Sequence, residues 1–226
     1  MTGPLASLCP RAVLIPVGPL GLRATLCVPS PIHGTVIFAQ GSGSSRLSPG
    51  NQHLTELLQA AGLGTLLLDL LTVPEEGMLA HHFHIDLLAE RLLDATEWIR
   101  TIPETAGHPI GYFGANSGAG AALAAAAREP DLIAGVVSRG GRPDLAGSDL
   151  SDVQAPTLLI VGSYDSAVLE VNRRALGQLR CAKRLVVIPG AGHLFEEVGA
   201  LDQVAGLASN WLAASFQGAA SPPVHR

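Results

Sequence analysis

The chain has 226 residues, of which 47% are hydrophobic and 15% are charged. This composition predicts one globular domain with ample apolar material for a buried core. The net charge is −5 and no basic cluster is present, which argues against a nucleic-acid partner. No apolar run approaches the roughly 18 residues that cross a bilayer, and the first ten residues lack the regions of a signal peptide. We therefore expect no membrane partner.

The cysteines, Cys9, Cys27 and Cys181, are odd in number, far apart and in no metal-ligand spacing. We interpret them as reduced packing residues, which is typical of a cytoplasmic protein. The sequence thus predicts a cytoplasmic location.

Short apolar runs alternate with longer helical patterns, which is typical of a parallel sheet with helices on both faces. Arg11–Val17 and Leu22–Val28 flank a Gly/Pro turn and are predicted to pair as an antiparallel hairpin. In chain order, the pattern then predicts a strand at Thr35–Ala39, a helix at Asn51–Ala61, a strand at Thr65–Leu70, a helix at Ile85–Ile102, a strand at Ile110–Phe113, a helix at Gly118–Arg128, strands at Leu132–Ser138 and Thr157–Val161, a helix at Leu169–Leu179, a strand at Arg184–Ile188 and a helix at Val198–Phe216.

These elements predict an α/β fold with about eight strands and five or six helices. Residues 1–216 are expected to form a single domain without a large lid, followed by a flexible tail at 217–226. Open α/β sheets bind ligands at the carboxyl ends of their strands. The polar loops at those ends are Gln40–Arg46, Asn116–Ser117, Ser163–Ser166 and Gly190–His193, so we expect the site there.

The segment Gly114–Gly118 has the pattern of a sharp strand-to-helix turn whose central residue projects into an active site. Its central residue is Asn116, which has no hydroxyl to serve as the usual acyl-accepting nucleophile. A shift by one residue would put Ser117 at the centre, flanked by two alanines that are also small. The glycines favour Asn116, and Ser117 stays as the alternative.

Asp165 and His193 fit the roles of an acid and a base in an active site. Each follows a predicted strand, so both are expected at the edge of the sheet where the turn opens. The acid would hold the imidazole in one tautomer and stabilise its protonated form. The alternative interpretations are an aspartate that caps the next helix and a histidine bonded to the backbone.

Six stretches resemble the small, lidless dienelactone-hydrolase-like branch of the α/β-hydrolases, whose members are often named beside phosphoribosyltransferases. They are Gln40–Arg46, Leu66–Thr72, Leu87–Leu92, Tyr112–Gly118, Ser138–Gly147 and Pro189–Glu197. The resemblance implies an α/β-hydrolase fold, and the order of turn residue, acid and histidine agrees with it. The family nucleophile falls on Asn116, Gln40 replaces a histidine, and His84 replaces an aspartate.

With Asn116 at the centre, the backbone N–H of Ser117 would be one donor to an oxyanion. A second N–H is expected from Gly41 or Ser42, directly after Gln40. The sequence therefore predicts a substrate and oxyanion site formed by Gln40, Gly41, Ser42 and Ser117.

Two further groups carry smaller expectations. His81, His82 and His84 lie close together, but no Asp, Glu or Cys stands at ligand spacing, so we expect a solvated loop and no metal or cofactor. Arg142 and Asp144 are expected to form a local ion pair, with contact to a substrate anion as the alternative.

The main hypothesis is a hydrolase of a small ester, lactone or thioester, with a small-molecule substrate. One alternative is a lyase, cyclase or isomerase in which His193 removes a proton. Another is a pseudoenzyme that keeps only the pocket, and a last one is deamidation of Asn116 to an aspartate nucleophile. The sequence specifies no oligomeric state.

Overall fold

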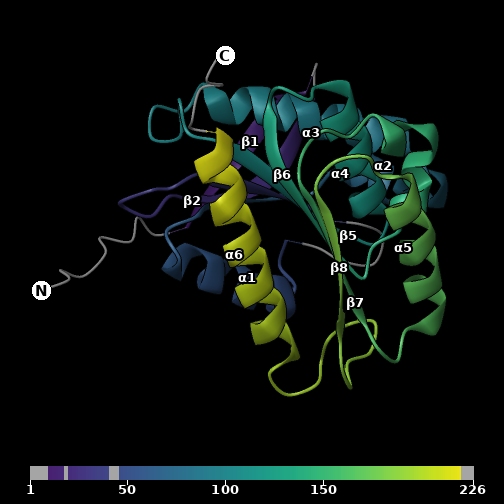
Figure 1. Ribbon diagram of the computed structural model, residues 1–226. Helices are drawn as coiled ribbons and strands as arrows, with labels where there is room; N and C mark the ends of the chain where they lie inside the picture. The colour runs from purple at the N-terminus through teal and green to yellow at the C-terminus, as the bar shows by residue number, and fades with distance from the viewer. Residues whose placement is uncertain (1–9, 18–19, 41–45, 220–226) are drawn as a thin grey trace, which may run out of the picture.

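The computed structural model describes residues 10–17, 20–40 and 46–219. The described strands form one eight-stranded sheet in the order β1-β2-β4-β3-β5-β6-β7-β8 (Figure 1). Their bounds are β1 Arg11–Val17, β2 Leu20–Cys27, β3 Thr35–Ala39, β4 Gly64–Leu68, β5 Ile110–Ala115, β6 Ile133–Arg139, β7 Thr157–Gly162 and β8 Lys183–Ile188. Strand β2 pairs antiparallel with β1 and β4, and the other pairs are parallel. The predicted, mostly parallel α/β sheet is confirmed.

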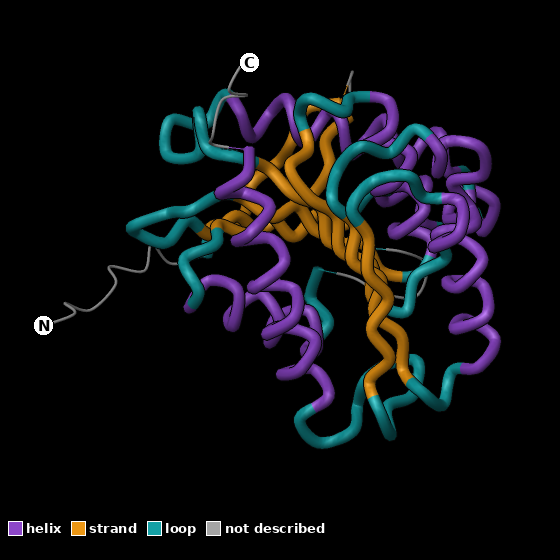
Figure 2. The backbone as a smooth tube through the Cα atoms, in the orientation of Figure 1, coloured by secondary structure: helices purple, strands orange, loops and turns teal. Residues whose placement is uncertain are grey.

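Helices cover both faces of this sheet (Figures 1 and 2). They are α1 Pro49–Ala60, α2 Val73–Glu76, α3 Ile85–Arg100, α4 Ser117–Arg128, α5 Ser166–Gln178 and α6 Ala200–Ala219, with 3-10 helices η1 Leu79–Phe83 and η2 Pro143–Ser151. Helices α1 and α6 share one apolar core with the sheet, and α3, α4 and α5 share the other.

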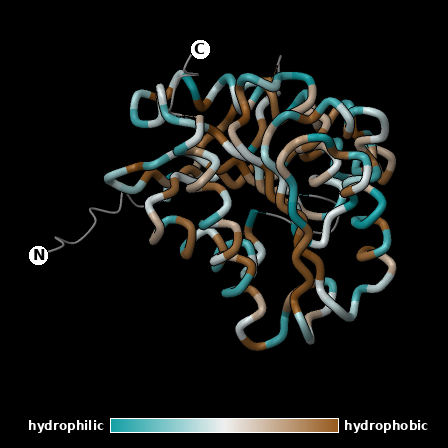
Figure 3. Tube along the Cα trace, in the orientation of Figure 1, coloured by the Kyte–Doolittle hydropathy of each residue, from teal (hydrophilic) through white to brown (hydrophobic). Residues whose placement is uncertain are grey.

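The central strands are apolar because both of their faces are covered. All residues of β3, β4, β5 and β7 are buried, and Figure 3 shows hydrophobic residues along the strands that cross the centre. Phe38 and Phe113 stack on the α1/α6 face with ring centroids 4.8 Å apart. On the other face, the hydroxyls of Tyr112 and Thr96 are 2.7 Å apart, and burial raises the pKa of Tyr112. Each face of the sheet therefore has its own core.

Three described elements were not expected from the sequence. Helices α2, η1 and η2 are short and have little apolar periodicity to predict them. Helix α6 continues to Ala219, so residues 217–219 of the expected flexible tail are helical. None of the described helices combines the length and the apolar character that crossing a membrane requires.

Candidate active site

Asn116 joins β5 to α4 through a strained backbone. Its φ is 51° and its ψ is −130°, a region that residues with a side chain rarely adopt. Among the described residues other than glycine, only Asn116 and Phe195 have a positive φ. Asn116 is an expected site residue, and Phe195 follows the expected site residue His193 by two positions. Such strain persists only where the surrounding structure enforces it, and it is common at active sites.

Two glycines make this turn possible. A Cβ atom on Gly114 would lie 2.5 Å from the Cα of Ala119, and one on Gly118 would lie 2.2 Å from the carbonyl oxygen of Ala39. Both approaches are to backbone atoms, so neither position admits a side chain. Asn116 lies midway between these glycines, whereas Ser117 begins α4 and is fully buried.

Asp165 follows β7 and uses its two carboxylate oxygens differently. Its Oδ1 accepts a hydrogen bond from the Val168 N–H at 3.4 Å and so caps α5. Its Oδ2 lies 2.6 Å from Nδ1 of His193. Capping of α5 and contact with the imidazole are therefore compatible, because each uses a different carboxylate oxygen of Asp165.

His193 follows β8 and connects Asp165 to the turn. Its Nε2 lies 3.1 Å from Oδ1 of Asn116. A carboxylate and an amide carbonyl are both acceptors, so the protonated imidazole would donate one hydrogen bond to each. After loss of the Nε2 proton, rotation of the amide would let its NH₂ group donate to the ring instead. The amide of Asn116 can thus partner either protonation state of His193.

Hydrogen bonds from neighbouring loops hold the His193 segment in place. Glu197 accepts from the Gly192 N–H at 2.9 Å, and the Ser163 hydroxyl accepts from the Gly190 N–H at 2.8 Å. The loop containing Asp165 is therefore tied to the loop containing His193. Glu197 and Ser163 were not singled out from the sequence, because no local pattern marks these partners.

The loop after β6 supports the turn from the other side. The carbonyl oxygen of Asn116 accepts hydrogen bonds from the Arg142 N–H at 2.9 Å and the Ala119 N–H at 3.2 Å. Buried Asn172 in α5 donates to the carbonyl of Gly141 at 3.0 Å, which fixes this loop. The turn is thus held by hydrogen bonds from two separate elements.

Arg139 ends β6 and pairs in register with Ala115, the residue before Asn116. It is partly buried, and its guanidinium has no hydrogen bond or ion pair to any described residue. The segments outside the described residues contain no Asp or Glu that could pair with it. Burial lowers the pKa of Arg139 to about 10. The site edge therefore carries a cation without an acidic partner, which the sequence did not reveal.

The expected oxyanion loop is described only at its ends. Gln40 is buried, and its side-chain oxygen accepts a hydrogen bond from Asn51 of α1 at 2.8 Å. Gly41 and Ser42 lie outside the described residues. This contact anchors Gln40 to the first turn of α1.

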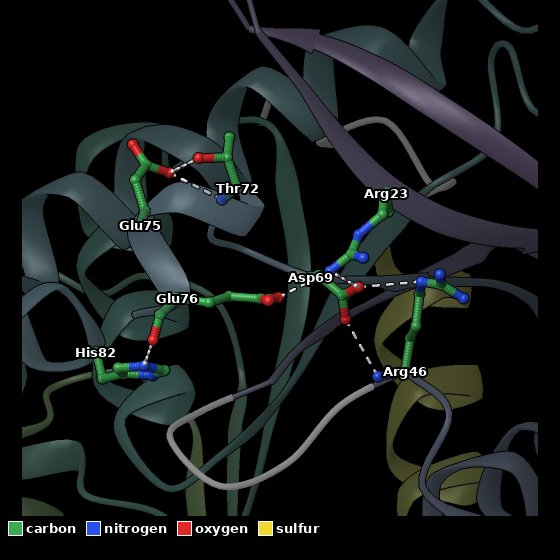
Figure 4. A network of polar contacts seen from close by, with 7 residues as sticks. All are labelled: Arg23, Arg46, Asp69, Thr72, Glu75, Glu76 and His82. Carbon is green, nitrogen blue, oxygen red and sulfur yellow. Dashed lines mark hydrogen bonds and ion pairs between the residues drawn. The ribbon is translucent and has the colours of Figure 1, made fainter. Parts of the chain in front are cut away.

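A network of ion pairs follows the carboxyl end of β4 (Figure 4). Buried Asp69 accepts from the backbone N–H of Arg46 at 3.2 Å and from its Nε at 3.0 Å. Arg23 of β2 lies 3.6 Å from Asp69 and 3.0 Å from Glu76 of α2. The network joins β2, α2 and the residue after β4 to Arg46, which is the described C-terminal end of the oxyanion loop.

The remaining sequence candidates have local partners. His84 caps α3 by accepting from the Leu87 N–H, and His82 bonds the carbonyl of Glu76. No cluster of three or more potential metal ligands occurs in the part of the chain that the structure describes. Arg142 and Asp144 form a two-bond ion pair at 2.8 and 2.7 Å, which agrees with the local interpretation.

Comparison with known proteins identifies the family. The family model described as "Dienelactone hydrolase family" matches residues 77–213, which include the turn, Asp165 and His193. The chain belongs to the dienelactone hydrolase family. A crystal structure of dienelactone hydrolase from Anabaena variabilis ATCC 29413 is 54% identical, with a TM-score of 0.86 over 91% of this chain and 97% of that one.

Other relatives of this dienelactone hydrolase family member differ in name or in sequence. Two Mycobacterium tuberculosis proteins named putative phosphoribosyl transferase are 54% identical over 199 residues, which cover 88% of this chain. The chain spans 45% of the length of these curated relatives. Est1E from Butyrivibrio proteoclasticus is 17% identical, with a TM-score of 0.76 over 91% of this chain and 99% of that one. That likeness shows the fold alone.

Proposed function

We propose that the chain is a hydrolase that acts on a small ester, lactone or thioester. The proposal rests on the contacts from Asp165 through His193 to Asn116, at 2.6 and 3.1 Å. An imidazole oriented by a carboxylate is suited to act as a general base and then as a general acid. Membership in the dienelactone hydrolase family supports hydrolysis as the reaction class.

In this proposal the attacking group is water, because Asn116 has no hydroxyl. Neutral His193 takes a proton from the water at Nε2 while the water oxygen bonds to the substrate carbonyl carbon. The side-chain amide of Asn116 orients the water by a hydrogen bond. The tetrahedral intermediate then expels the leaving group, and protonated His193 returns the proton to it.

The proposed oxyanion donors are the backbone N–H of Ser117 and an amide from Gly41 or Ser42. Ser117 is the first residue of α4, where the partial positive charge of the helix favours an anion. Full burial of the Ser117 side chain makes it a poor nucleophile in place of Asn116.

The proposed substrate carries a negative charge near its reacting carbonyl. This part of the proposal is supported by Arg139, whose guanidinium has no hydrogen-bonding or ionic partner among the described residues and lies on the strand next to Asn116. A partly buried cation without a partner is costly, and an anionic ligand would relieve that cost.

The test compares the wild-type chain with Asn116→Ser on small p-nitrophenyl esters and lactones. A hydroxyl at 116 would stand within reach of His193, so we expect kcat/KM to rise about 100-fold or more. Adding His193→Ala to that variant should remove the gain. Ser148→Ala changes an exposed serine of η2 and is the matched control, with no gain expected. If Asn116→Ser gains nothing on any ester or lactone, the proposed hydrolysis is wrong.

A further inference from the structure

The backbone of Asn116 is held by the protein elements that surround it. Its carbonyl oxygen is held by the N–H groups of Arg142 and Ala119, which belong to different elements. Gly114 and Gly118 pack directly against backbone atoms on either side. The φ of 51° and the ψ of −130° are therefore properties of the folded turn.

This ψ aligns the side chain of Asn116 with the next backbone nitrogen. Around a tetrahedral Cα, Cβ and N are separated by about 120°, so a ψ of −130° gives a Cβ–Cα–C–N dihedral of about −10°. Adding about 120° to ψ in the same way gives a Cβ–Cα–C–N dihedral of about 80° in an α-helix and about −105° in an antiparallel strand. A five-membered ring between Cγ of Asn116 and N of Ser117 needs this dihedral close to zero. The turn thus fixes the one backbone dihedral that ring closure requires.

His193 supplies a proton donor to the same amide. Its Nε2 lies 3.1 Å from Oδ1 of Asn116, so the protonated ring polarises the carbonyl at Cγ. It also stabilises the negative charge that develops on Oδ1 when a nitrogen adds to Cγ. Asp165, 2.6 Å from Nδ1, orients the ring and stabilises its charge.

We infer that Asn116 is a self-modification site, at which the side chain closes onto Ser117 and is hydrolysed to aspartate. The Ser117 nitrogen loses its proton and bonds to Cγ, the Cγ–Nδ2 bond breaks, and Nδ2 takes up a proton and leaves as ammonia. Water then adds to Cγ of the cyclic imide, and the Cγ–N bond breaks, which restores the backbone N–H. The net reaction converts asparagine and water into aspartate and ammonia.

The fold accommodates the imide intermediate. Ser117 is the first residue of α4, where a backbone N–H has no acceptor within the helix. Proline, which also lacks that N–H, is favoured at this position. Ring closure at Ser117 therefore removes no helical hydrogen bond.

The product places a carboxylate next to His193. An aspartate side chain is ionised near neutral pH, so it needs no base before it attacks a substrate. The modification would supply the nucleophile that the amide lacks. It does not depend on the proposed ester hydrolysis, because the reacting group belongs to the chain itself.

The experiment is peptide mapping by mass spectrometry of the purified, folded full chain, incubated near neutral pH in water labelled with heavy oxygen. Asn51, Asn172 and Asn210 lie within helices and serve as internal controls. We expect conversion at Asn116 at least about tenfold faster than at these residues, with one heavy oxygen in the new carboxylate. In denaturant this difference should disappear, because ψ is no longer fixed. A folded-state rate at Asn116 no faster than at the helical asparagines would overturn the inference.

The role of His193 is tested by substitution. His193→Ala should slow the conversion about tenfold, whereas His53→Ala, which removes an exposed histidine paired with Asp202, should leave the rate unchanged. An unchanged rate in His193→Ala would contradict the assigned proton donor. Chain isolated with position 116 already converted and the helical asparagines intact would support the inference.

Discussion

The turn at Asn116 and the network at Asp69 lie at the same edge of the sheet, but they are built in opposite ways. Asp69 is a buried acceptor whose charge is matched by Arg46 and Arg23, on a backbone without positive φ (Figure 4). Asn116 has a strained backbone, and the neighbouring Arg139 has no partner among the described residues. Backbone strain and an unpaired charge are thus found together at the turn, whereas the charges of the Asp69 network are paired. Such local violations are typical of functional sites.

The largest expected effect comes from Gly118→Ala, which breaks the turn. The added Cβ would lie 2.2 Å from the Ala39 carbonyl oxygen, so we expect the free energy of unfolding to fall by about 3 kcal/mol. Gly206→Ala is the matched control, because a Cβ there meets nothing within 4 Å. It lies inside α6 and should gain about 0.5–1 kcal/mol. Urea unfolding measures both changes, and equal effects would contradict the tight turn.

Asp69→Asn removes the negative charge at the centre of the Asp69 network. The substitution leaves Arg46 and Arg23 without the charge that they share, and Asp69 is buried. We expect a loss of about 1–3 kcal/mol in the free energy of unfolding. Asp202→Asn, which removes an exposed partner of His53, should stay within about 0.5 kcal/mol. A loss at Asp69 no larger than this control would mean that the network contributes little.

Arg139→Met tests whether the positive charge of Arg139, beside the turn at Asn116, is unpaired and therefore destabilising. Removing this cation should raise the free energy of unfolding by about 1 kcal/mol, while binding of small carboxylates weakens. The folded-state pKa of about 10 lies below the ordinary 12.5, so the unfolded chain holds more protons between these values. The destabilisation by charged Arg139 is therefore present below pH 10. The increase in the free energy of unfolding from Arg139→Met should shrink as the pH rises above about 10.

Arg142→Met is the control for Arg139, because it removes a cation that has a partner in Asp144. Thermal melting with and without a small carboxylate measures both variants. The control should lose at most about 1 kcal/mol. A loss of stability in Arg139→Met would contradict the view that its charge is unmatched.

The smallest expected effect is at Glu75, beside the Asp69 network. Burial raises the pKa of Glu75. The hydrogen bonds from Thr72 and the charge of Arg91 together lower it by more than burial raises it, so the net shift of the pKa is downward. The folded pKa lies below the ordinary 4.5, so this stabilisation is present above that pH and is lost as the pH falls through the folded pKa.

Glu75→Gln should therefore lower Tm by about 2 °C near neutral pH, and the difference should vanish in strong acid. Glu90→Gln, at an exposed glutamate of α3, is the control and should show no such pH dependence. A pH-independent difference for Glu75→Gln would show that its charge is not the stabilising property.

Local patterns predicted most of the fold because they are set by burial. The strand at Thr35–Ala39 was predicted with its observed bounds, since an all-apolar run between polar loops has few other solutions. Helix α4 was predicted to within one residue from its small residues after a Gly turn. Helix α2 was missed, because four residues give no periodicity to read.

The site was only partly predictable. Asp165 and His193 were marked by their place after strands, but Asn172 and Glu197 were not. Asn172 acts on Gly141, which lies 31 positions away, and no local pattern links such residues. The unmatched charge of Arg139 likewise became visible only when every neighbour was in place.

By itself, the sequence determined that an asparagine stands between two glycines after a buried strand. Only the tertiary structure decided that Asn116, and not Ser117, meets His193, which lies 77 positions away in the chain. The physical reason is packing between distant segments, because Gly118 of α4 lies against the carbonyl of Ala39 and no Cβ fits there. That contact sets the register of the turn, and with it the side chain that faces the imidazole.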